Sequence, residues 1–325
     1  MTGLFSLAWA LAADWLFGDP EGLPHPVCAV GRFIGWWDRL ARKRLSGGER
    51  SAFRLRLAGL AGWCATVAGT FLFVWATVAA AGRLSAAAGF LVQTYWLFSG
   101  LAATCLSREA AAVAGFLRAG DLPSARRRLA GLVGRDTGEL SSYQVVQAVV
   151  ETVAENCSDG ALAPIFWAAL GAPFGLSAPA MWAYKAVNTM DSMVGYLDET
   201  HRDIGFVPAK ADDVFNWIPA RLAVILFALM APSLGFDGAK TLRTGFEQGR
   251  RHLSPNAGYP EAAMAGALGI TLGGTHTYGG MTVVKPELTG GTDEPNVRHI
   301  DMARSFLWPA TLWAALLLSP LWLLP

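Results

Sequence analysis

The densest acidic motif in the chain is Glu151-x-x-x-Glu155-Asn156-x-Ser158-Asp159-Gly160. Its three carboxylates recur every four residues, so on a helix they share one face. Like charges at this spacing destabilise a helix unless something compensates them. Mg²⁺ binds carboxylates while keeping water and phosphate oxygens in its shell, which makes these residues candidate metal ligands. A solvated acidic face is the alternative, but the motif runs directly into an apolar segment at Ala161.

A second polar stretch, Tyr184–Met193, places Lys185, Asn188, Asp191 and Ser192 on one helical face. Lysine holds phosphate as a point charge and aspartate ligates cations, a combination that suits phosphoryl transfer. A buried ion pair between Lys185 and Asp191 is the alternative. Farther along, two carboxylates, an amide and a bidentate anion binder precede another apolar segment: Asp212, Asp213, Asn216 and Arg221.

Two proline-containing stretches also carry polar groups. Asp19–Pro26 follows the first apolar segment, and its prolines favour a rigid turn that holds Asp19 and His25. In Ser254–Glu261, the proline suits the first turn of a helix, whose free N–H groups attract phosphate. Ordinary loop and helix caps are the alternatives. The chain has no G-x-x-x-x-G-K-[ST] loop, Rossmann fingerprint or HExxH motif, so a nucleotide must bind by another scheme.

Long charge-free segments must position these residues. Of the 325 residues, 53% are apolar and 16% are charged, and five charge-free runs reach the ~20 residues that cross a bilayer. This composition excludes a disordered chain, a small disulfide scaffold and a purely soluble enzyme. The 26 basic and 25 acidic residues nearly cancel, which gives no net field for nucleic acid. The four cysteines lack metal-type spacing, so we expect no protein-bound redox metal.

We predict an all-α integral membrane protein, a polytopic helical bundle with broken or re-entrant segments and cytoplasmic helical loops. Segment 160–184 contains helix-breaking prolines and glycines, and 222–236 is short for a span, so we expect these two to be interrupted or re-entrant. The prediction treats residues 1–325 as one domain. Its apolar segments are 1–17, 57–82, 84–107, 160–184, 222–236, 262–284 and 305–325, and its polar loops are 18–56, 108–159, 185–221, 237–261 and 285–304.

Basic residues predict the orientation. They concentrate in 14–56 and 108–159, on either side of a hairpin formed by 57–82 and 84–107. Because Lys and Arg accumulate on the cytoplasmic side, both loops are expected in the cytoplasm. Met1–Phe17 lacks the basic region and cleavage site of a signal peptide, so we expect a retained membrane segment with Met1 outside.

The chain resembles the CobD/CbiB family of adenosylcobinamide-phosphate synthases from Asp14 to beyond Tyr278. Five ordered motifs carry the resemblance. They are Asp19-Pro20 with Leu23-Pro24-His25-Pro26; Glu155–Gly160 with Ala163-Pro164; Tyr184-Lys185 through Asn188–Met193 to Gly195-Tyr196; Asp212-Asp213 with Asn216 and Pro219–Leu222; and Ser254–Gly258 with Pro260–Ala267.

The resemblance implies a multi-pass enzyme of the bacterial inner membrane that acts in cobalamin biosynthesis. It joins the propionate carboxylate of adenosylcobyric acid to the amine of aminopropanol O-phosphate, or of ethanolamine phosphate, with ATP and Mg²⁺. The corrinoid cobalt belongs to the substrate. The lipid bilayer and other late corrinoid-pathway enzymes are the expected partners, without nucleic acid. A transporter of a polar or corrinoid substrate is the main alternative, and a non-catalytic scaffold is a third.

Such a reaction needs an activated carboxylate and a deprotonated amine at a cytoplasm-facing site. We predict Lys185 and Arg221 as ligands of phosphate oxygens and Asp19 or His25 as the base. The predicted catalytic residues are Asp19, His25, Lys185 and Asp191. The predicted metal ligands are Glu151, Glu155, Asp159, Asp191, Asp212 and Asp213, and the predicted substrate or phosphate ligands are Asn156, Ser158, Asn188, Ser192, Arg221, Ser254 and Asn256.

Overall fold

The computed structural model describes residues 2–19, 22, 24–45, 51–196 and 198–324. Its described residues are mostly helical, with a single two-stranded sheet among them, which confirms the predicted all-α membrane class. The chain, predicted as one domain, divides into two compact units. Unit 1 comprises Met1–Leu101, Ala163–Asn216 and Leu317–Pro325, and unit 2 comprises Ala102–Leu162 and Trp217–Leu316.

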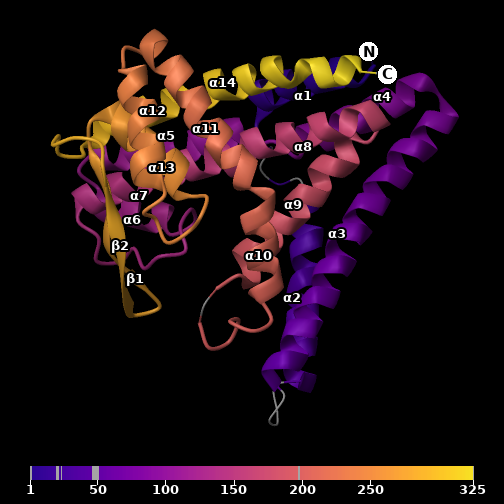
Figure 1. Ribbon diagram of the computed structural model, residues 1–325, viewed down its shortest axis with the longest axis horizontal. Helices are drawn as coiled ribbons and strands as arrows, with labels where there is room; N and C mark the ends of the chain where they lie inside the picture. Colours follow the sequence, from indigo (N-terminus) through magenta and orange to yellow (C-terminus); the bar gives the residue numbers. More distant parts are fainter. Residues whose placement is uncertain (1, 20–21, 23, 46–50, 197, 325) are drawn as a thin grey trace. The chain divides into compact units, whose positions relative to one another are not determined.

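Unit 1 is helical throughout its described secondary structure. Helices α3 and α4 form the predicted hairpin, and Ser85 caps α4 by accepting a hydrogen bond from the Ala88 amide at 3.0 Å. Helix α2 lies along the N-terminal half of α3 (Figure 1). The helices are α1 (Thr2–Phe17), α2 (Pro26–Leu45), α3 (Ser51–Leu84), α4 (Ala86–Phe98), α8 (Ala163–Gly171), α9 (Ser177–Val194) and α10 (Phe206–Phe215), with 3₁₀ turns at Ala172–Phe174 and Ser319–Leu323.

Unit 2 combines helices with the two-stranded sheet. Helices α12 and α13 pack together, and α7 contacts both α5 and α13. The helices are α5 (Ala103–Arg118), α6 (Leu122–Leu129), α7 (Ser142–Cys157), α11 (Trp217–Met230), α12 (Gly238–Gly249), α13 (Gly258–Leu268) and α14 (Val297–Leu318), with a π-helical turn at Ser158–Leu162 and a 3₁₀ turn at Ala231–Leu234.

The sheet is an antiparallel hairpin of β1 (Thr271–Tyr278) and β2 (Met281–Thr289). Gly279 and Gly280 connect the strands, both with positive φ, as the two-residue turns of hairpins favour. This hairpin corrects the prediction for segment 262–284. The segment is too broken for a membrane helix, because α13 ends at Leu268, Gly269 caps it in the left-handed conformation, and β1 begins two residues after Gly269.

Four helical segments of the described chain are long and apolar enough to cross a membrane: Ser51–Leu84, Ala86–Arg118, Trp217–Leu234 and Val297–Leu323. Gly3–Phe17 is a shorter apolar helix. Segment 222–236 was predicted to be short for a span. The third helical segment is longer than this prediction, because its helix begins five residues earlier at Trp217. Segment 160–184 is interrupted by π-helical and 3₁₀ turns, as its prolines predicted. These segments support a multi-pass membrane protein.

Candidate functional site

Glu151 is the centre of a group of charged side chains inside unit 2. It lies on α7, which begins with a capping box between Ser141 and Gln144. The Glu151 side chain is only 3% exposed and forms an ion pair with Arg135. Its other carboxylate oxygen accepts a hydrogen bond from the Gly273 amide at 2.8 Å. A buried carboxylate requires such partners, and here a guanidinium and a backbone amide satisfy it.

The β-hairpin supplies further members of the group. Arg135 also donates a hydrogen bond to Nδ1 of His276, on β1, at 2.9 Å. Because a guanidinium only donates, Nδ1 is an acceptor and the neutral ring carries its proton on Nε2. This Nε2 atom is buried and has no hydrogen-bond partner among the described residues. It is therefore free to donate a hydrogen bond.

A second histidine lies beside a buried carboxyl group. The Ser254 amide donates to Nδ1 of His252 at 3.1 Å, so this neutral ring also carries its proton on Nε2. That atom lies 3.7 Å from a carboxylate oxygen of Glu261, in the first turn of α13. Both side chains are less than 5% exposed. We call the whole group the charged cluster: Arg135, Glu151, Glu155, His252, Glu261, His276 and Lys285.

Burial and mutual charge set the protonation of the charged cluster. Burial lowers the pKa of both His252 and His276 to about 4, reinforced by Lys285 and Arg135 respectively. Burial raises the pKa of Glu261 well above its ordinary value, and the negative charges of Glu151 and Glu155 add to this.

The remaining groups follow the same balance. Burial also raises the pKa of Glu155. Burial opposes ionisation of Glu151 too, but the positive charge of Arg135 outweighs burial and holds the pKa of Glu151 below its ordinary value. Although burial opposes the charge of Lys285, the nearby carboxylates, Glu261 first, raise its pKa. Permanent cations beside the N–H groups of neutral imidazoles can bind an anion.

The predicted face of three carboxylates is only partly present. Glu151 and Glu155 lie one turn apart on α7, but the helix ends at Cys157 and Asp159 lies in the π-helical turn. A π turn changes the helical repeat, so Asp159 does not continue the four-residue spacing. The turn also contains Ser158, whose buried hydroxyl has no hydrogen-bond partner among the described residues. Asn156 is half-buried. π turns of this kind are frequent at functional sites.

Arg221 and Asn256, both predicted ligands, contact each other in unit 2. The Arg221 guanidinium donates to the Asn256 side-chain oxygen at 2.8 Å and lies 3.9 Å from the centre of the Tyr259 ring. Ser254 accepts hydrogen bonds from the Asn256 and Ala257 amides in the turn before α13, whose own N-cap residue, Ala257, makes no side-chain cap hydrogen bond. The stretch therefore forms a turn that holds Asn256 beside the oriented Arg221 guanidinium.

In unit 1, His25 lies among charged and aromatic groups. Its Nδ1 accepts from the Val27 amide at 3.2 Å, and its Nε2 lies 3.7 Å from Asp19. Burial lowers the pKa of His25, Asp19 raises it, and the positive charge of Lys185 lowers it again. The structure thus brings these three predicted catalytic residues together. Pro20, Glu21 and Leu23 of the same predicted turn lie outside the described residues.

The other predicted residues of unit 1 form a polar network on α9 and α10. Asp212 accepts hydrogen bonds from Asn188 at 3.3 Å and from Asn216 at 3.0 Å. Asn216 in turn accepts one from the buried Tyr184 hydroxyl at 2.8 Å. Asp213 instead pairs with Lys210 at the surface. The network fixes Asn188 and Asp212 on the same helix pair as Lys185.

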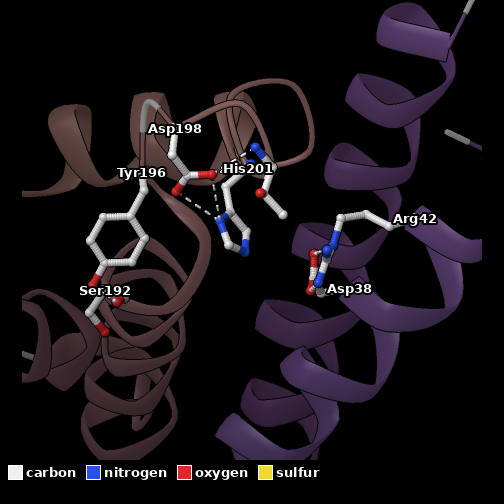
Figure 2. A network of polar contacts seen from close by, with 7 residues as sticks. Asp38, Arg42, Ser192, Tyr196, Asp198 and His201 are labelled. Atoms are coloured by element: carbon white, nitrogen blue, oxygen red, sulfur yellow. Dashed lines mark hydrogen bonds and ion pairs between the residues drawn. The ribbon is translucent and has the colours of Figure 1, made fainter. Parts of the chain in front are cut away.

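The end of α9 carries the last two predicted residues of this stretch. Ser192 is exposed and donates to the Thr189 carbonyl at 3.0 Å, while Tyr196 donates to the Ser192 carbonyl at 2.8 Å. Figure 2 shows Ser192 and Tyr196 beside the Asp198–His201 pair. Asp191 is half-buried, close to Gly195. Ser192 is therefore held by local turn contacts.

An apolar cavity of about 420 Å³ lies near His25 in unit 1. It is lined by α2, α3, α4 and α9, including Pro26, Trp96 and Trp182. The Trp182 ring centre is 6.3 Å from that of His25. Small-molecule sites are commonly apolar cavities with a few polar groups at the edge, and this cavity has that composition.

The fit to Mg²⁺ can be judged from the carboxylates. Both oxygens of Glu151 are engaged by Arg135 and Gly273, so a guanidinium compensates this charge. Within the described residues, no group of three His, Cys, Asp or Glu side chains is arranged to hold a metal. A three-carboxylate cage does not fit this arrangement. A single carboxylate is enough to hold Mg²⁺ where phosphate oxygens complete its shell. As ligands of that kind, the six predicted metal ligands stay a prediction.

Sequence reasoning missed five members of the charged cluster as site residues: Arg135, His252, Glu261, His276 and Lys285. Arg135 lies in the basic loop 108–159, which served only to predict the orientation in the membrane. Glu261 was named only as the end of the stretch Ser254–Glu261. One signal was available for His276. It lies in the charge-free run 262–284, and an ionisable residue inside an apolar segment is by default a functional candidate.

The helices and the charged cluster define a polytopic membrane protein with a buried, ionisable polar site. A family model described as CobD/Cbib protein matches residues 7–307. The chain belongs to the CobD/CbiB family.

Several curated relatives are similar over almost their whole length. Cobalamin biosynthesis protein CobD of Klebsiella pneumoniae is 43% identical over 307 residues, 94% of this chain and 93% of that protein. CobD of Listeria monocytogenes serovar 1/2a is 40% identical, covering 96% of each chain. Cobalamin biosynthesis protein CbiB of Salmonella typhimurium is 41% identical, also covering 96% of each. No solved structure is significantly similar.

Proposed function

We propose that this protein acts in cobalamin biosynthesis as an ATP-dependent ligase. It joins the propionate carboxylate of adenosylcobyric acid to the amine of aminopropanol O-phosphate, or of ethanolamine phosphate, to give adenosylcobinamide phosphate or its ethanolamine counterpart. The observation that carries the proposal is near-full-length similarity to relatives named cobalamin biosynthesis protein CobD or CbiB. The site belongs to a multi-pass protein of the bacterial inner membrane and faces the cytoplasm, where ATP is available.

The chemistry of amide formation matches groups in unit 1. An ammonium must lose its proton before it attacks an activated carboxyl group, and a half-buried imidazole with a lowered pKa is neutral and able to accept that proton. His25 is therefore the proposed base. It accepts the proton at Nδ1, in place of the 3.2 Å hydrogen bond from the Val27 amide, while its protonated Nε2 faces Asp19. Lys185, whose charge acts on His25, is the proposed ligand of a phosphate group.

The charged cluster in unit 2 supports binding of polar substrate groups. Arg135 and Lys285 are cations for phosphate or carboxylate oxygens, and Arg221 presents a guanidinium fixed by Tyr259 and Asn256. ATP activates the substrate carboxylate by transferring phosphate to it with release of ADP, or AMP with release of pyrophosphate. The attacking amine then displaces the phosphate or AMP. Mg²⁺ enters the proposal as the counter-ion of the ATP phosphates, with single carboxylates as its protein ligands.

The direct test uses the full chain purified in detergent. It receives adenosylcobyric acid, aminopropanol phosphate, ATP and Mg²⁺, and mass spectrometry follows the amide product. We expect ATP-dependent formation of the amide product, and at least tenfold less product in Lys185→Ala. Arg243→Ala is the control, because Arg243 is exposed and pairs only with the surface residue Glu247 among the described residues.

The same preparation distinguishes the alternatives. Absence of product with active wild-type controls from a relative would refute the ligase. Uptake of corrinoid into sealed vesicles without amide formation would instead support the transporter. If neither product nor uptake is detected, the remaining alternative is a scaffold for other corrinoid enzymes.

A further inference from the structure

The C-terminal end of α2 carries a concentration of positive charge beside a membrane-length helix. Its last turn contains Arg42, Lys43 and Arg44. Helix α2 runs along the N-terminal half of α3 (Figure 1). The charge-free part of α3 begins at Leu57. If 57–82 crosses the hydrocarbon, the end of α2 lies at the height of the lipid head groups.

A cavity of about 180 Å³ opens between α2 and α3 at this height. An apolar cavity of ~150 Å³ accepts a six-carbon ring, so this one accepts a segment of hydrocarbon chain. The Trp37 indole is fixed on one side by donating to the Ala58 carbonyl at 2.9 Å. The lining is apolar except for one guanidinium: Trp37, Leu40, Ala41, Arg44, Leu45 and Ala58.

The neighbouring arginines are already paired. Arg42 donates to Asp38 at 2.8 Å on α2 (Figure 2), and Arg56 donates to Asp203 at 3.0 Å. Arg44 is exposed and makes no hydrogen bond or ion pair with any residue the structure describes. Among the described residues it is therefore the cation of the cavity lining without an anionic partner.

We propose that this cavity binds an anionic phospholipid, with a segment of one acyl chain against its apolar lining and the phosphate on Arg44. Cations at a helix C-terminus also stabilise the helix dipole, which explains basic residues there. The dipole does not explain an apolar cavity directly beside the Arg44 guanidinium. A basic group next to an apolar slot at the membrane interface matches both parts of an anionic lipid.

The test measures lipid binding to the full chain in detergent by native mass spectrometry. The probes are phosphatidylglycerol and phosphatidylcholine with the same acyl chains. We expect a preference for phosphatidylglycerol that falls about fivefold in Arg44→Ala, because one cation near an anionic lipid contributes ~1 kcal/mol. Arg83→Ala is the matched control, since Arg83 is an exposed arginine near the opposite end of α3.

Two further arms separate lipid from phosphate. Ala58→Phe fills the cavity, so we expect it to weaken binding of both lipids, with the unfolding midpoint checked in detergent alone. Millimolar inorganic phosphate should not displace phosphatidylglycerol. Equal losses in Arg44→Ala and Arg83→Ala, or displacement by phosphate, would overturn the proposal. None of these readouts depends on ligase activity.

Discussion

Arg135 contacts Glu151 and His276 at the same time, so one guanidinium joins α7 to the β-hairpin inside unit 2. Burial of any one of these groups alone would cost several kcal/mol. Here Arg135 donates to both Glu151 and His276, which offsets part of the cost of burying the three groups. The contact therefore couples the stability of the hairpin to the charge on α7.

Replacing Glu151 tests this coupling. In Glu151→Ala, Arg135 is left buried without its counter-ion, and we expect a loss of about 3–5 kcal/mol of stability. The measurement is chemical unfolding of the full chain in detergent.

The double variant Glu151→Leu with Arg135→Met supplies the comparison. It removes both charges, so its loss should be smaller, by at least ~1 kcal/mol, than the sum of the losses in Glu151→Leu alone and Arg135→Met alone. Strictly additive losses would show that the two side chains do not interact.

Gly273 offers a backbone test of the same contact. Its φ of +87° strains any other residue, and a Cβ there would lie 2.4 Å from the Pro286 carbonyl oxygen. Gly273→Ala should therefore shift the strand and move the backbone amide at position 273 out of hydrogen-bond range of Glu151. We expect a loss of stability above ~2 kcal/mol.

Gly274 is the matched control for this change. Its φ is +94°, but nothing lies within 4 Å of an added Cβ. Gly274→Ala should show only the backbone strain, ~1 kcal/mol. Equal thermal destabilisation of the two variants would contradict the predicted role of the close approach.

The buried histidines predict a dependence of stability on pH. In the folded protein the pKa of His276 is about 4, below the ordinary 6.5, so the unfolded chain binds more protons between these values. The stability contributed by neutral His276 is complete above pH 6.5 and is lost as pH falls towards 4, by at most ~3 kcal/mol.

His276→Gln should remove this part of the acid sensitivity. Glu261 acts in the opposite sense, because its raised pKa favours the folded state at low pH. The informative measurement is thus the difference between wild type and His276→Gln in unfolding midpoint from pH 7 to 4.5. A difference that stays constant across this range would be evidence against a neutral His276.

His25 should respond to its two charged neighbours in opposite directions. Lys185→Met removes a positive charge and should raise the pKa of His25, whereas Asp19→Asn removes a negative charge and should lower it. The pH dependence of kcat/KM for amide formation measures both shifts. Movement of the acidic limb in the same direction in both variants would exclude His25 as the base.

The sequence predicted the membrane class and the polar stretches because hydrophobic length and charge spacing are local properties. It also brought Asp19, His25 and Lys185 into one hypothesis, and these residues do lie together in unit 1. The hairpin was missed although Gly279-Gly280 between two stretches rich in Thr, Tyr and Val is a hairpin signal. The length and low charge of 262–284 instead favour a membrane segment.

The charged cluster could not be assembled from the sequence. Arg135 and His276 are 141 residues apart, and no periodicity relates them. The sequence also did not predict that the acidic face on α7 ends before Asp159, because a π turn depends on tertiary packing rather than on residue spacing. Burial, rather than residue type, is what gives His252 and Glu261 their unusual protonation.

The turn of the β-hairpin is held as firmly as its base. The Asp136 carboxylate accepts hydrogen bonds from the Gly279 and Gly280 amides at 3.1 and 2.8 Å, directly after Arg135 in the chain. Surface turns ordinarily tolerate insertions and deletions. This turn is clamped at a fixed distance from the charged cluster, so adding or removing a residue would detach one end or the other. Its length is therefore part of the site's architecture.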